Sequence, residues 1–240
     1  DVLVVTPELD HDHHGADEYG VIRVPALQHF NSTDFSVKLP VPGLLSRVVS
    51  DFEPDIVHSH HPFLMGDTAL RVAATHNVPV VYTFHTFYER YTHYVPGDSP
   101  TLKAFVKKLA VGYANLCDTV IAPSPTVQRV LTERGVQRDI VVIPTGIETE
   151  AFANGRRDRG RQRLGIPAEA PLAGIISRLA PEKNMPLISR SAATFLRNNE
   201  QAWFVAVGSG PSEDMLRSTV EHYGVADRLV AALIACLRDH

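Results

Sequence analysis

Cysteine is scarce in this chain. Only Cys117 and Cys236 occur among 240 residues, and each stands alone in apolar surroundings of helical character. Such usage excludes a small disulfide scaffold and is typical of reduced, buried thiols. We therefore expect a cytoplasmic protein.

Long apolar runs and a charge excess are also lacking. No apolar run approaches the roughly 20 residues that a membrane-spanning helix needs, and no signal-peptide pattern is present. Any membrane contact is therefore expected to be peripheral. A net charge of -4 and a pI of about 6.3 argue against a general nucleic-acid binder. The 44% hydrophobic and 21% charged residues are those of a globular protein whose length suits two small domains.

Short apolar runs alternate with amphipathic segments over residues 1–150. Helices are predicted between the strands, and one of them starts at Ser124–Pro125 and closes at Gly135. The predicted strands are Val2–Val5, Val21–Val24, Ile56–Val57, Val78–Thr83, Thr119–Ala122 and Ile140–Ile143. Because parallel neighbours need a crossover helix, this alternation predicts a doubly wound, mostly parallel sheet in a Rossmann-like domain.

A second α/β domain is predicted over residues 151–240. It opens with an arginine-rich linker and edge helix at 154–163, and its first strands are Leu172–Ile176 and Trp203–Val207. The apolar run Leu172–Ile176 is typical of a strand covered on both faces. Ser212 is expected to cap the next helix, and residues 231–240 read as a terminal helix.

Two cations follow the strand Leu172–Ile176. Arg178 and Lys183 lie in its loop, where Asn184 is expected to cap a helix with Pro186 in its first turn. The free N–H groups of a helix start carry partial positive charge, so a diphosphate would suit this place. The alternative is a pair of solvated loop cations beside Glu182.

Three motifs, in order and spacing, carry a family resemblance. They are I-P-T-G-I at 143–147, S-R-L-A-P-E-K-N at 177–184 and V-G-S-G-P at 207–211, with Phe152 after the first. Over nearly its whole length the chain resembles the retaining GT-B glycosyltransferases of family four. The segment 83–96, which begins T-F-H-T, resembles the bacterial diacylglycerol glucosyltransferases within that family.

This resemblance implies two Rossmann-like domains that face a cleft, with ligands at the carboxyl ends of the strands. It implies transfer of a hexose, expected to be glucose from UDP-glucose, to a lipid acceptor such as diacylglycerol at a membrane surface. No cofactor is implied. The alternatives are another nucleotide sugar, such as a GDP-sugar, a soluble acceptor, or a non-catalytic module that binds nucleotide or lipid.

The resemblance also implies roles for individual residues. Arg178 and Lys183 match the cations that stabilise the leaving diphosphate, and His85 matches the histidine that hydrogen-bonds the donor sugar. Glycines would let the backbone approach the nucleotide at Gly208, Ser209 and Gly210. The expected acceptor-side residues are His60, His61, Tyr88, Glu89, Tyr91 and Tyr94.

Each of these assignments has a structural alternative. His85 could be a core histidine bonded to a backbone carbonyl, and residues 88–94 could be a packed aromatic loop. Leu102, Phe105, Val106, Leu109 and Tyr113 share one helix face. Beside it, three lysines could meet anionic lipid headgroups or form a solvated face: Lys103, Lys107 and Lys108.

Two histidine clusters, Asp10–His14 and His58–His61, raise the question of a metal site. Imidazole and carboxylate ligands suit zinc, copper or nickel. The spacing matches no metal motif, and neither cluster resembles the Asp-x-Asp site of the other large glycosyltransferase fold. No metal is therefore predicted.

The chain departs from the family pattern at both ends. Members begin with one more strand, the central one of the sheet, and its loss would leave open ladder edges. They also carry two glutamates eight positions apart after the Gly-x-Gly-Pro turn, whereas the last glutamate here is Glu221. We expect absent segments, with one junction near Val230 and Ala231. A chain that truly ended as written would not transfer sugar.

Overall fold

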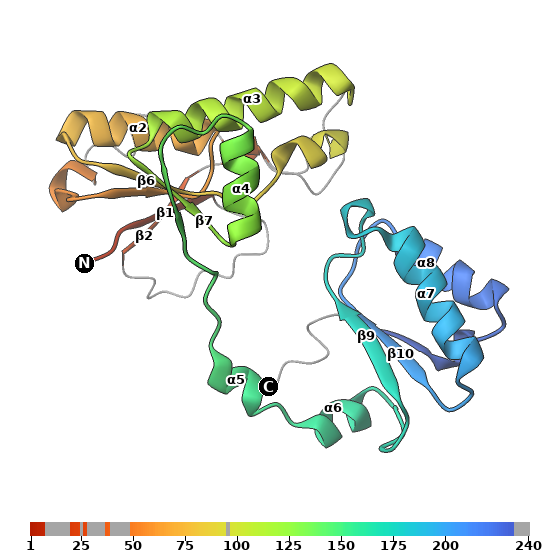
Figure 1. The fold of residues 1–240 in the computed structure, drawn as a ribbon. Helices are drawn as coiled ribbons and strands as arrows, with labels where there is room; N and C mark the ends of the chain where they lie inside the picture. The colour runs from red at the N-terminus through yellow and green to blue at the C-terminus, as the bar shows by residue number, and fades with distance from the viewer. Residues whose placement is uncertain (8–19, 25, 28–36, 39–48, 95–96, 233–240) are drawn as a thin grey trace. The chain divides into compact units, whose positions relative to one another are not determined.

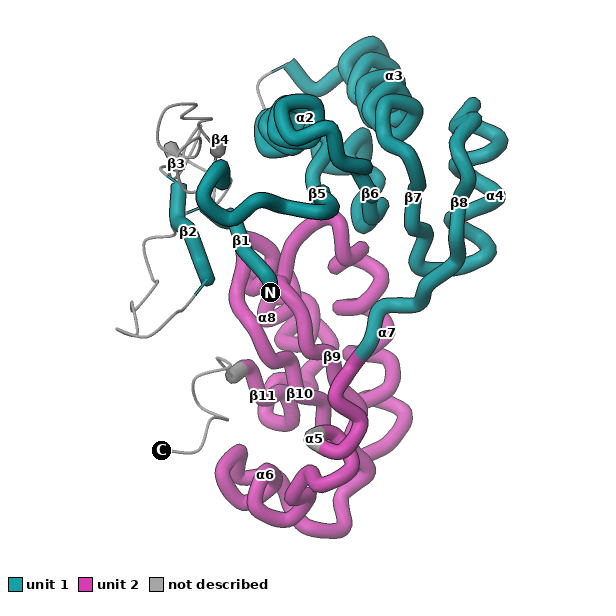
Figure 2. The backbone as a smooth tube through the Cα atoms, turned by 90° about the vertical axis from the view of Figure 1, so that its left-hand side faces the viewer, with its two compact units in different colours: residues 1–146 teal, residues 147–240 magenta. Residues whose placement is uncertain are grey.

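A computed structural model describes residues 1–7, 20–24, 26–27, 37–38, 49–94 and 97–232 (Figure 1). The chain divides into two compact units, residues 1–146 and 147–240 (Figure 2). The boundary expected at residue 150 falls within the short helix α5, Thr149–Ala153. Each unit has its own parallel sheet and its own core.

The main sheet of unit 1 has four parallel strands in the order β5-β6-β7-β8. These strands are Val57–Ser59, Val80–Thr83, Thr119–Ala122 and Asp139–Val142. The helices that connect them are α2 (Leu64–His76), α3 (Pro100–Leu116) and α4 (Pro125–Glu133). Two 3₁₀ turns, η2 (Tyr88–Arg90) and η3 (Thr92–Tyr94), lie between β6 and α3. The predicted parallel, doubly wound arrangement is confirmed.

Helices α3 and α4 begin with the same local signal. A serine side chain accepts a hydrogen bond from the backbone N–H three residues later, and a proline follows: Ser99–Pro100 for α3 and Ser124–Pro125 for α4. The serine satisfies one N–H that the helix leaves unbonded, and proline has no N–H to satisfy. The helix start predicted at Ser124–Pro125 is thus confirmed.

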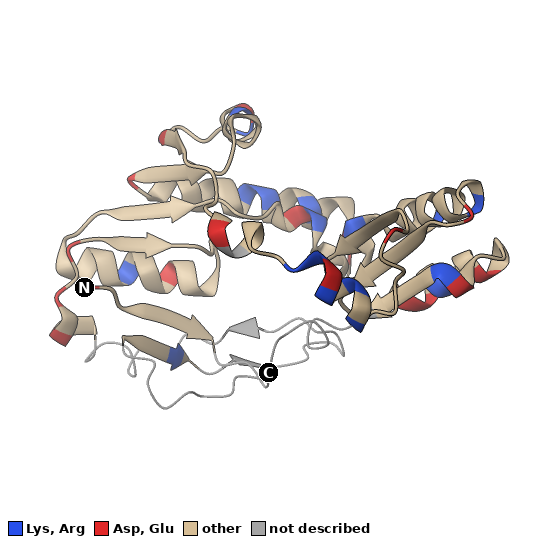
Figure 3. Cartoon of the chain, turned by 90° about the horizontal axis from the view of Figure 1, so that it is seen from below, with Lys and Arg blue, Asp and Glu red and all other residues tan. Residues whose placement is uncertain are grey.

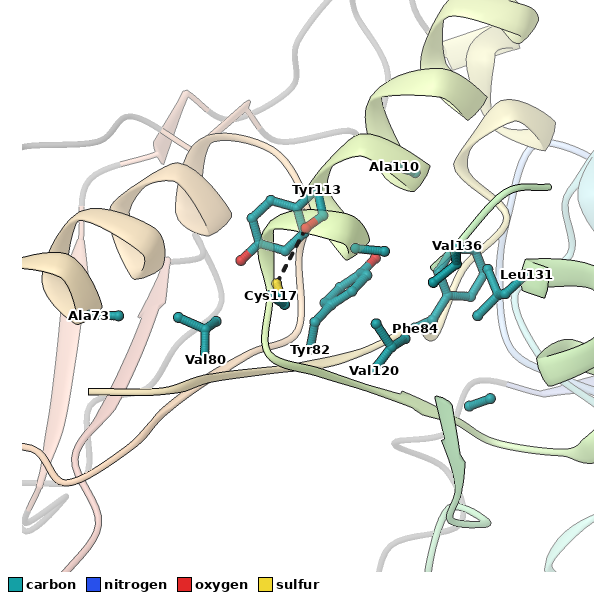
Figure 4. Packing of buried hydrophobic residues seen from close by; sticks show 12 residues of the cluster. Ala73, Val80, Tyr82, Phe84, Ala110, Tyr113, Cys117, Val120, Leu131 and Val136 are labelled. Carbon is teal, nitrogen blue, oxygen red and sulfur yellow. Dashed lines mark hydrogen bonds between the residues drawn. The ribbon is translucent and has the colours of Figure 1, made fainter. Parts of the chain in front are cut away.

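Tyr82 of β6 lies in the centre of the unit 1 core (Figure 4). Its ring packs edge-on against Tyr113, with 5.0 Å between ring centroids, and against Phe84, at 6.2 Å. Cys117 lies beside Tyr113, with its Sγ 3.4 Å from the Tyr113 carbonyl oxygen. Burial raises the pKa of the Cys117 thiol to about 11, as expected for a buried, reduced cysteine. Cys236 lies outside the described residues.

Two further strand pairs belong to unit 1. Strands β1 (Val4–Pro7) and β2 (Val21–Val24) are parallel, and β3 (Ala26–Leu27) pairs antiparallel with β4 (Val37–Lys38). Apolar side chains of the β1–β2 pair pack against α2, which also covers β5. The same helix therefore links this pair to the main sheet.

Among the described strands, β1 pairs only with β2 and β5 only with β6. A cavity of about 400 Å³ is lined by every residue of β1 and by consecutive residues 56–61 at β5. Because successive side chains of a strand point to opposite faces, lining by consecutive residues means that the cavity runs along the strand edges. Within the described residues, β1 and β5 thus each keep one ladder edge without a strand partner, as expected in general terms for a sheet that lacks a central strand.

The sheet of unit 2 has three parallel strands in the order β11-β10-β9. They are β9 (Leu172–Ile176), β10 (Trp203–Val207) and β11 (Leu229–Ala232). Helices α7 (Met185–Asn198) and α8 (Glu213–His222) bury one face of β9 and β10. On the opposite face Ile176 is 75% exposed. The expectation that this strand is covered on both faces is therefore wrong, because no described helix packs closely over the Ile176 face of β9.

The arginine-rich segment forms α6 (Arg157–Arg163), which follows α5 (Figure 3). Arg161 donates from Nη1 to the carbonyls of Pro167, at 2.8 Å, and Ala170, at 2.9 Å. Arg157 donates to the carbonyl of Ala168 at 2.8 Å. The predicted edge helix is present, and its arginines hold the turn that leads into β9.

Two local predictions in unit 2 are wrong. Ser212 precedes α8, but its side chain makes no capping hydrogen bond. Ala231 and Ala232 do not begin a terminal helix, because they pair in β11 with Ala206 and Val207 of β10. The remaining residues of that predicted helix, 233–240, lie outside the described part of the chain.

Candidate functional site

Histidines gather where β5 and β6 end. His58 and His60 are two residues apart and so point to one side of the strand. The neighbouring strand ends at Thr83, and His85 lies two residues further on. The distance between His58 Nε2 and Thr83 Oγ1 is 2.7 Å, and the distance between His60 Nδ1 and His85 Nε2 is 2.9 Å. The parallel pairing of β5 with β6 thus brings together residues 25 positions apart.

The three rings are close enough to affect one another's charge. The ring centroids of His58 and His60 are 4.2 Å apart, and those of His60 and His85 are 5.2 Å apart. Partial burial, and after it the neighbouring imidazoles, lower the pKa of both His58 and His60. A proton on one ring therefore opposes a proton on the next.

No group of three or more His, Cys, Asp or Glu side chains in the described ranges is arranged to hold a metal ion. His58–His61 lies within those ranges. The other cluster, Asp10–His14, lies outside the described residues.

His61 belongs to different surroundings from His60. Its ring packs edge-on against Phe63 and Tyr88, with 5.3 Å between centroids in each case. Phe63 and Tyr88 are themselves 5.0 Å apart, and burial raises the pKa of the Tyr88 phenol to about 12. Both histidines were expected on the acceptor side. His60 thus belongs to the cluster of imidazoles, whereas His61 belongs to an aromatic cluster with Phe63 and Tyr88.

Glu89 forms an ion pair with Arg134, which directly follows α4. Its Oε1 accepts a hydrogen bond of 2.6 Å from Nη2 of Arg134, and the side chains of Glu89 and Arg134 are 14% and 20% exposed. The Arg134 guanidinium carbon also lies 4.6 Å from the Phe87 ring centroid. Tyr94 is buried, with the ring of Tyr91 stacked 6.4 Å away. Glu89 and Tyr94 are placed as the packed-loop alternative describes, and sequence reasoning did not identify Arg134.

In unit 2 the loops that follow β9 and β10 lie side by side. The Ser177 N–H donates to the Val207 carbonyl at 3.0 Å, and the Leu179 N–H donates to the Ser209 carbonyl at 2.9 Å. Arg178 stands between these two bonded residues and is half-buried. The backbone on both sides of Arg178 is therefore fixed by the neighbouring loop.

Gly208 and Gly210 make this close approach possible. Their φ angles are 131° and 156°, and a Cβ atom at either position would collide with the carbonyl group of Ser177 or Leu179. Only glycine adopts such positive φ angles without strain and has no Cβ atom to collide with these carbonyls. The sequence predicted an approach of these glycines to a nucleotide, whereas the structure shows that they also join two loops.

Lys183 is exposed at the end of a 3₁₀ turn, η4 (Pro181–Lys183), directly before α7. Pro186 lies in the first turn of α7, as predicted. The capping role predicted for Asn184 is wrong, because its side chain makes no capping hydrogen bond. Asn184 instead takes the left-handed conformation, with φ 54° and ψ 48°, that joins η4 to the helix. The loop thus places two cations before the start of a 14-residue helix.

Helix α3 presents apolar side chains to solvent. Tyr113 of the predicted face is buried, whereas Phe105 is 56% exposed and Leu109 is also exposed. Leu116, about two helical turns after Leu109, is exposed as well, so that Phe105, Leu109 and Leu116 form an exposed row. Among the nearby lysines, Lys103 pairs with Asp98 at 3.3 Å. No helix in the described part of the chain is long and apolar enough to cross a membrane.

Comparison with known proteins gives two family matches. Residues 1–151 match the model "Glycosyltransferase Family 4", and residues 156–231 match "Glycosyl transferases group 1". The alpha-monoglucosyldiacylglycerol synthase of Streptococcus pneumoniae is 26% identical over 226 residues, which cover 92% of this chain and 51% of that protein. A GDP-mannose-dependent alpha-mannosyltransferase of Mycobacterium tuberculosis is 26% identical over 226 residues, which cover 92% and 57%. The chain thus spans about half the length of these relatives.

The fold also matches solved structures. HepE from Anabaena, in a crystal structure with UDP and glucose, aligns with a TM-score of 0.60 at 20% identity. The match covers 90% of this chain and 57% of HepE. This likeness establishes the GT-B fold class. The family-four model spans well over half of the chain, and on that ground the chain belongs to glycosyltransferase family 4.

Proposed function

We propose that a protein containing this chain is a retaining glycosyltransferase whose unit 2 binds the diphosphate of a nucleotide sugar. The observation that carries the proposal is the fixed backbone around Arg178. It is held by the Ser177–Val207 and Leu179–Ser209 hydrogen bonds, while Lys183 lies at the start of α7. Family membership supplies the class of reaction.

In this proposal Arg178 and Lys183 act on the leaving group. Negative charge grows on the diphosphate as the bond between the sugar and the phosphate breaks, and fixed cations stabilise that charge. The planar guanidinium of Arg178 suits two phosphate oxygens, and the Lys183 ammonium supplies a point charge. The amino end of α7 adds partial positive charge. No metal cofactor is assigned a role.

His85 of unit 1 is proposed to contact the donor sugar. Its ring is exposed at the end of β6, and the bond from Nε2 to His60 leaves its Nδ1 for a ligand. A neutral imidazole both donates and accepts hydrogen bonds, which suits a sugar hydroxyl. Ser209 and the adjacent glycines are proposed to border the nucleotide.

Glucose from UDP-glucose and a diacylglycerol-type acceptor are the proposed substrates. They rest on the pneumococcal relative, which is named a monoglucosyldiacylglycerol synthase. The exposed row on α3 supports a lipid acceptor, because apolar side chains such as Phe105 and Leu116 beside a lysine, here Lys108, suit the surface of an anionic membrane. We propose peripheral binding through this helix.

Nucleotide binding tests the first part. Isothermal titration with UDP is compared among the wild type, Arg178→Ala, Lys183→Ala and the control Arg190→Ala, which removes an exposed cation of α7. A charge-assisted hydrogen bond is worth roughly 1.5–3 kcal/mol, or about 10- to 150-fold in affinity. We expect that loss in the first two variants and none in the control. Unchanged UDP affinity in both would refute the diphosphate site.

Vesicle sedimentation tests the second part. Phe105→Ser combined with Lys108→Ser should reduce binding to vesicles that contain phosphatidylglycerol, whereas Ala104→Ser on the same helix should leave it unchanged. Equal binding of the wild type, the double variant and Ala104→Ser would remove α3 from the proposal.

A GDP-sugar donor is the second candidate, because one relative is a GDP-mannose-dependent enzyme. Titration with GDP in parallel with UDP separates the two donors, and tighter binding of GDP would favour the second. Nucleotide binding without sugar transfer by the complete gene product would favour a non-catalytic module.

A further inference from the structure

The proposed function uses His85, but the structure joins this residue to two further imidazoles. His60 bonds to it through Nδ1, with ring planes inclined by only 20°. On its other side His60 lies against His58, whose Nε2 is held by the Thr83 hydroxyl. His60 is thus located between an anchored ring and the ring proposed to meet the sugar.

A hydrogen bond between two imidazole nitrogens requires one N–H group and one lone pair. When Nδ1 of His60 carries the hydrogen, His85 keeps its proton on Nδ1 and offers an N–H donor away from His60. When Nε2 of His85 carries the hydrogen, His85 offers a lone pair at Nδ1 instead. The hydrogen bond therefore couples the two tautomers, so that the state of the pair sets whether His85 donates to a sugar hydroxyl or accepts from it.

We propose that His60 is a positioning residue, which holds the ring of His85 in a single tautomer and orientation. The consequence for sugar binding rests on the proposed function, whereas the His60–His85 pairing concerns unit 1 alone. The parallel register of β5 and β6, in which Ser59 lies opposite Tyr82, fixes the two strand ends that His60 and His85 directly follow. The hydrogen bond between the two rings therefore forms without a bound ligand.

The charges around the pair favour this arrangement. Partial burial and the neighbouring imidazoles lower the pKa of His58 and His60, which favours the neutral form of His60 with one N–H and one lone pair. The groups that lower these pKa values electrostatically are imidazoles, and no carboxylate of the described residues contributes. Nearby ionisable groups have other contacts: His61 packs on Tyr88, and Glu89 pairs with Arg134.

Nitrogen-15 NMR of the imidazoles tests the proposal on the 240-residue chain, with signals assigned through His85→Gln. In the wild type we expect two well-separated His85 nitrogen signals, which indicate one tautomer. In His60→Ala they should move to averaged positions. His60→Asn places an amide near the lost Nδ1 and should restore the separation, whereas His76→Asn, at the end of α2, should leave the wild-type pattern. Averaged signals in the wild type, or no change in His60→Ala, would overturn the inference.

Kinetics of a protein with transferase activity give a second readout. We expect kcat to fall roughly tenfold in His60→Ala, with partial recovery in His60→Asn and little change in the KM for donor. A fixed tautomer without any transfer activity would leave the positioning inference intact and refute the proposed function. Full activity in His60→Ala would refute the inference and leave the proposed function intact.

Discussion

The ion pair between Glu89 and Arg134 allows a quantitative test of whether the loop after β6 is a structural element. The pair joins the 3₁₀ turn η2 to the end of α4, with N and O atoms 2.6 Å apart and both side chains at most 20% exposed. We expect Glu89→Gln, which removes the charge and keeps the volume, to destabilise unit 1 without changing its fold.

The magnitude follows from burial. Two unit charges about 4 Å apart attract by about 4 kcal/mol at an effective dielectric constant of about 20 and by about 1 kcal/mol in water. Exposed pairs contribute up to about 1 kcal/mol, whereas breaking a fully buried pair costs about 3–5 kcal/mol. For this intermediate exposure we expect Glu89→Gln to lower the free energy of unfolding by about 2 kcal/mol. Arg134→Met should cost slightly more, because it also removes the contact with Phe87.

Urea unfolding followed by far-UV circular dichroism measures both variants and the double variant. A double-mutant cycle should give a coupling energy of about 1 kcal/mol or more. The matched control is Glu213→Gln, because its exposed pair with Arg217 should contribute less than about 0.5 kcal/mol. A loss below about 0.5 kcal/mol in Glu89→Gln, together with loss of sugar transfer, would refute the structural reasoning and support an acceptor role.

Three further outcomes are expected. Tyr82→Phe should stabilise unit 1 by about 1 kcal/mol in thermal unfolding, because in the described part of the structure the buried Tyr82 hydroxyl has no hydrogen-bond partner. Gly208→Ala should lower the free energy of unfolding by about 2 kcal/mol or more, because its Cβ atom would collide with the Ser177 carbonyl. Urea unfolding followed by the fluorescence of Trp203, the single tryptophan, measures this loss. The control Gly112→Ala, in the middle of α3, should leave stability unchanged or raise it. Stability should fall as pH drops through 6.5, because the lowered pKa values of His58 and His60 make the unfolded chain bind protons that the folded chain does not; a double His→Asn variant should flatten this dependence.

Local patterns in the sequence were sufficient for much of the fold. The strands Thr119–Ala122, Leu172–Ile176 and Trp203–Val207 were predicted at the observed bounds, because a proline, a serine or a glycine directly follows each apolar run. Serine followed by proline correctly marked the start of α4. These signals act within a few residues and need no knowledge of what the segment packs against.

Predictions failed where the outcome depended on distant parts of the chain. Whether Ile176 is covered depends on which helices lie over β9, and an apolar run does not contain that information. The candidate cations and His85 came from motifs, whereas the partner of Glu89 lies 45 residues away and the partner of His85 lies 25 residues away. Only the sheet order and helix packing bring such residues together. The i, i+2 spacing of His58 and His60 was the one available signal for the imidazole cluster.

The edges of β1 and β5, which lack a strand partner within the described residues, have a consequence for the behaviour of the chain in solution. Unpaired backbone N–H and C=O groups along a strand are a template for a strand from another molecule, and apolar side chains around the opening favour its capture. Natural sheets protect such edges with charged residues or proline, whereas β1 has no charged residue and has its proline, Pro7, only at its end. We therefore expect self-association of this chain to depend on protein concentration and to respond little to added salt. It would then be governed by backbone hydrogen bonding rather than by the net charge of -4.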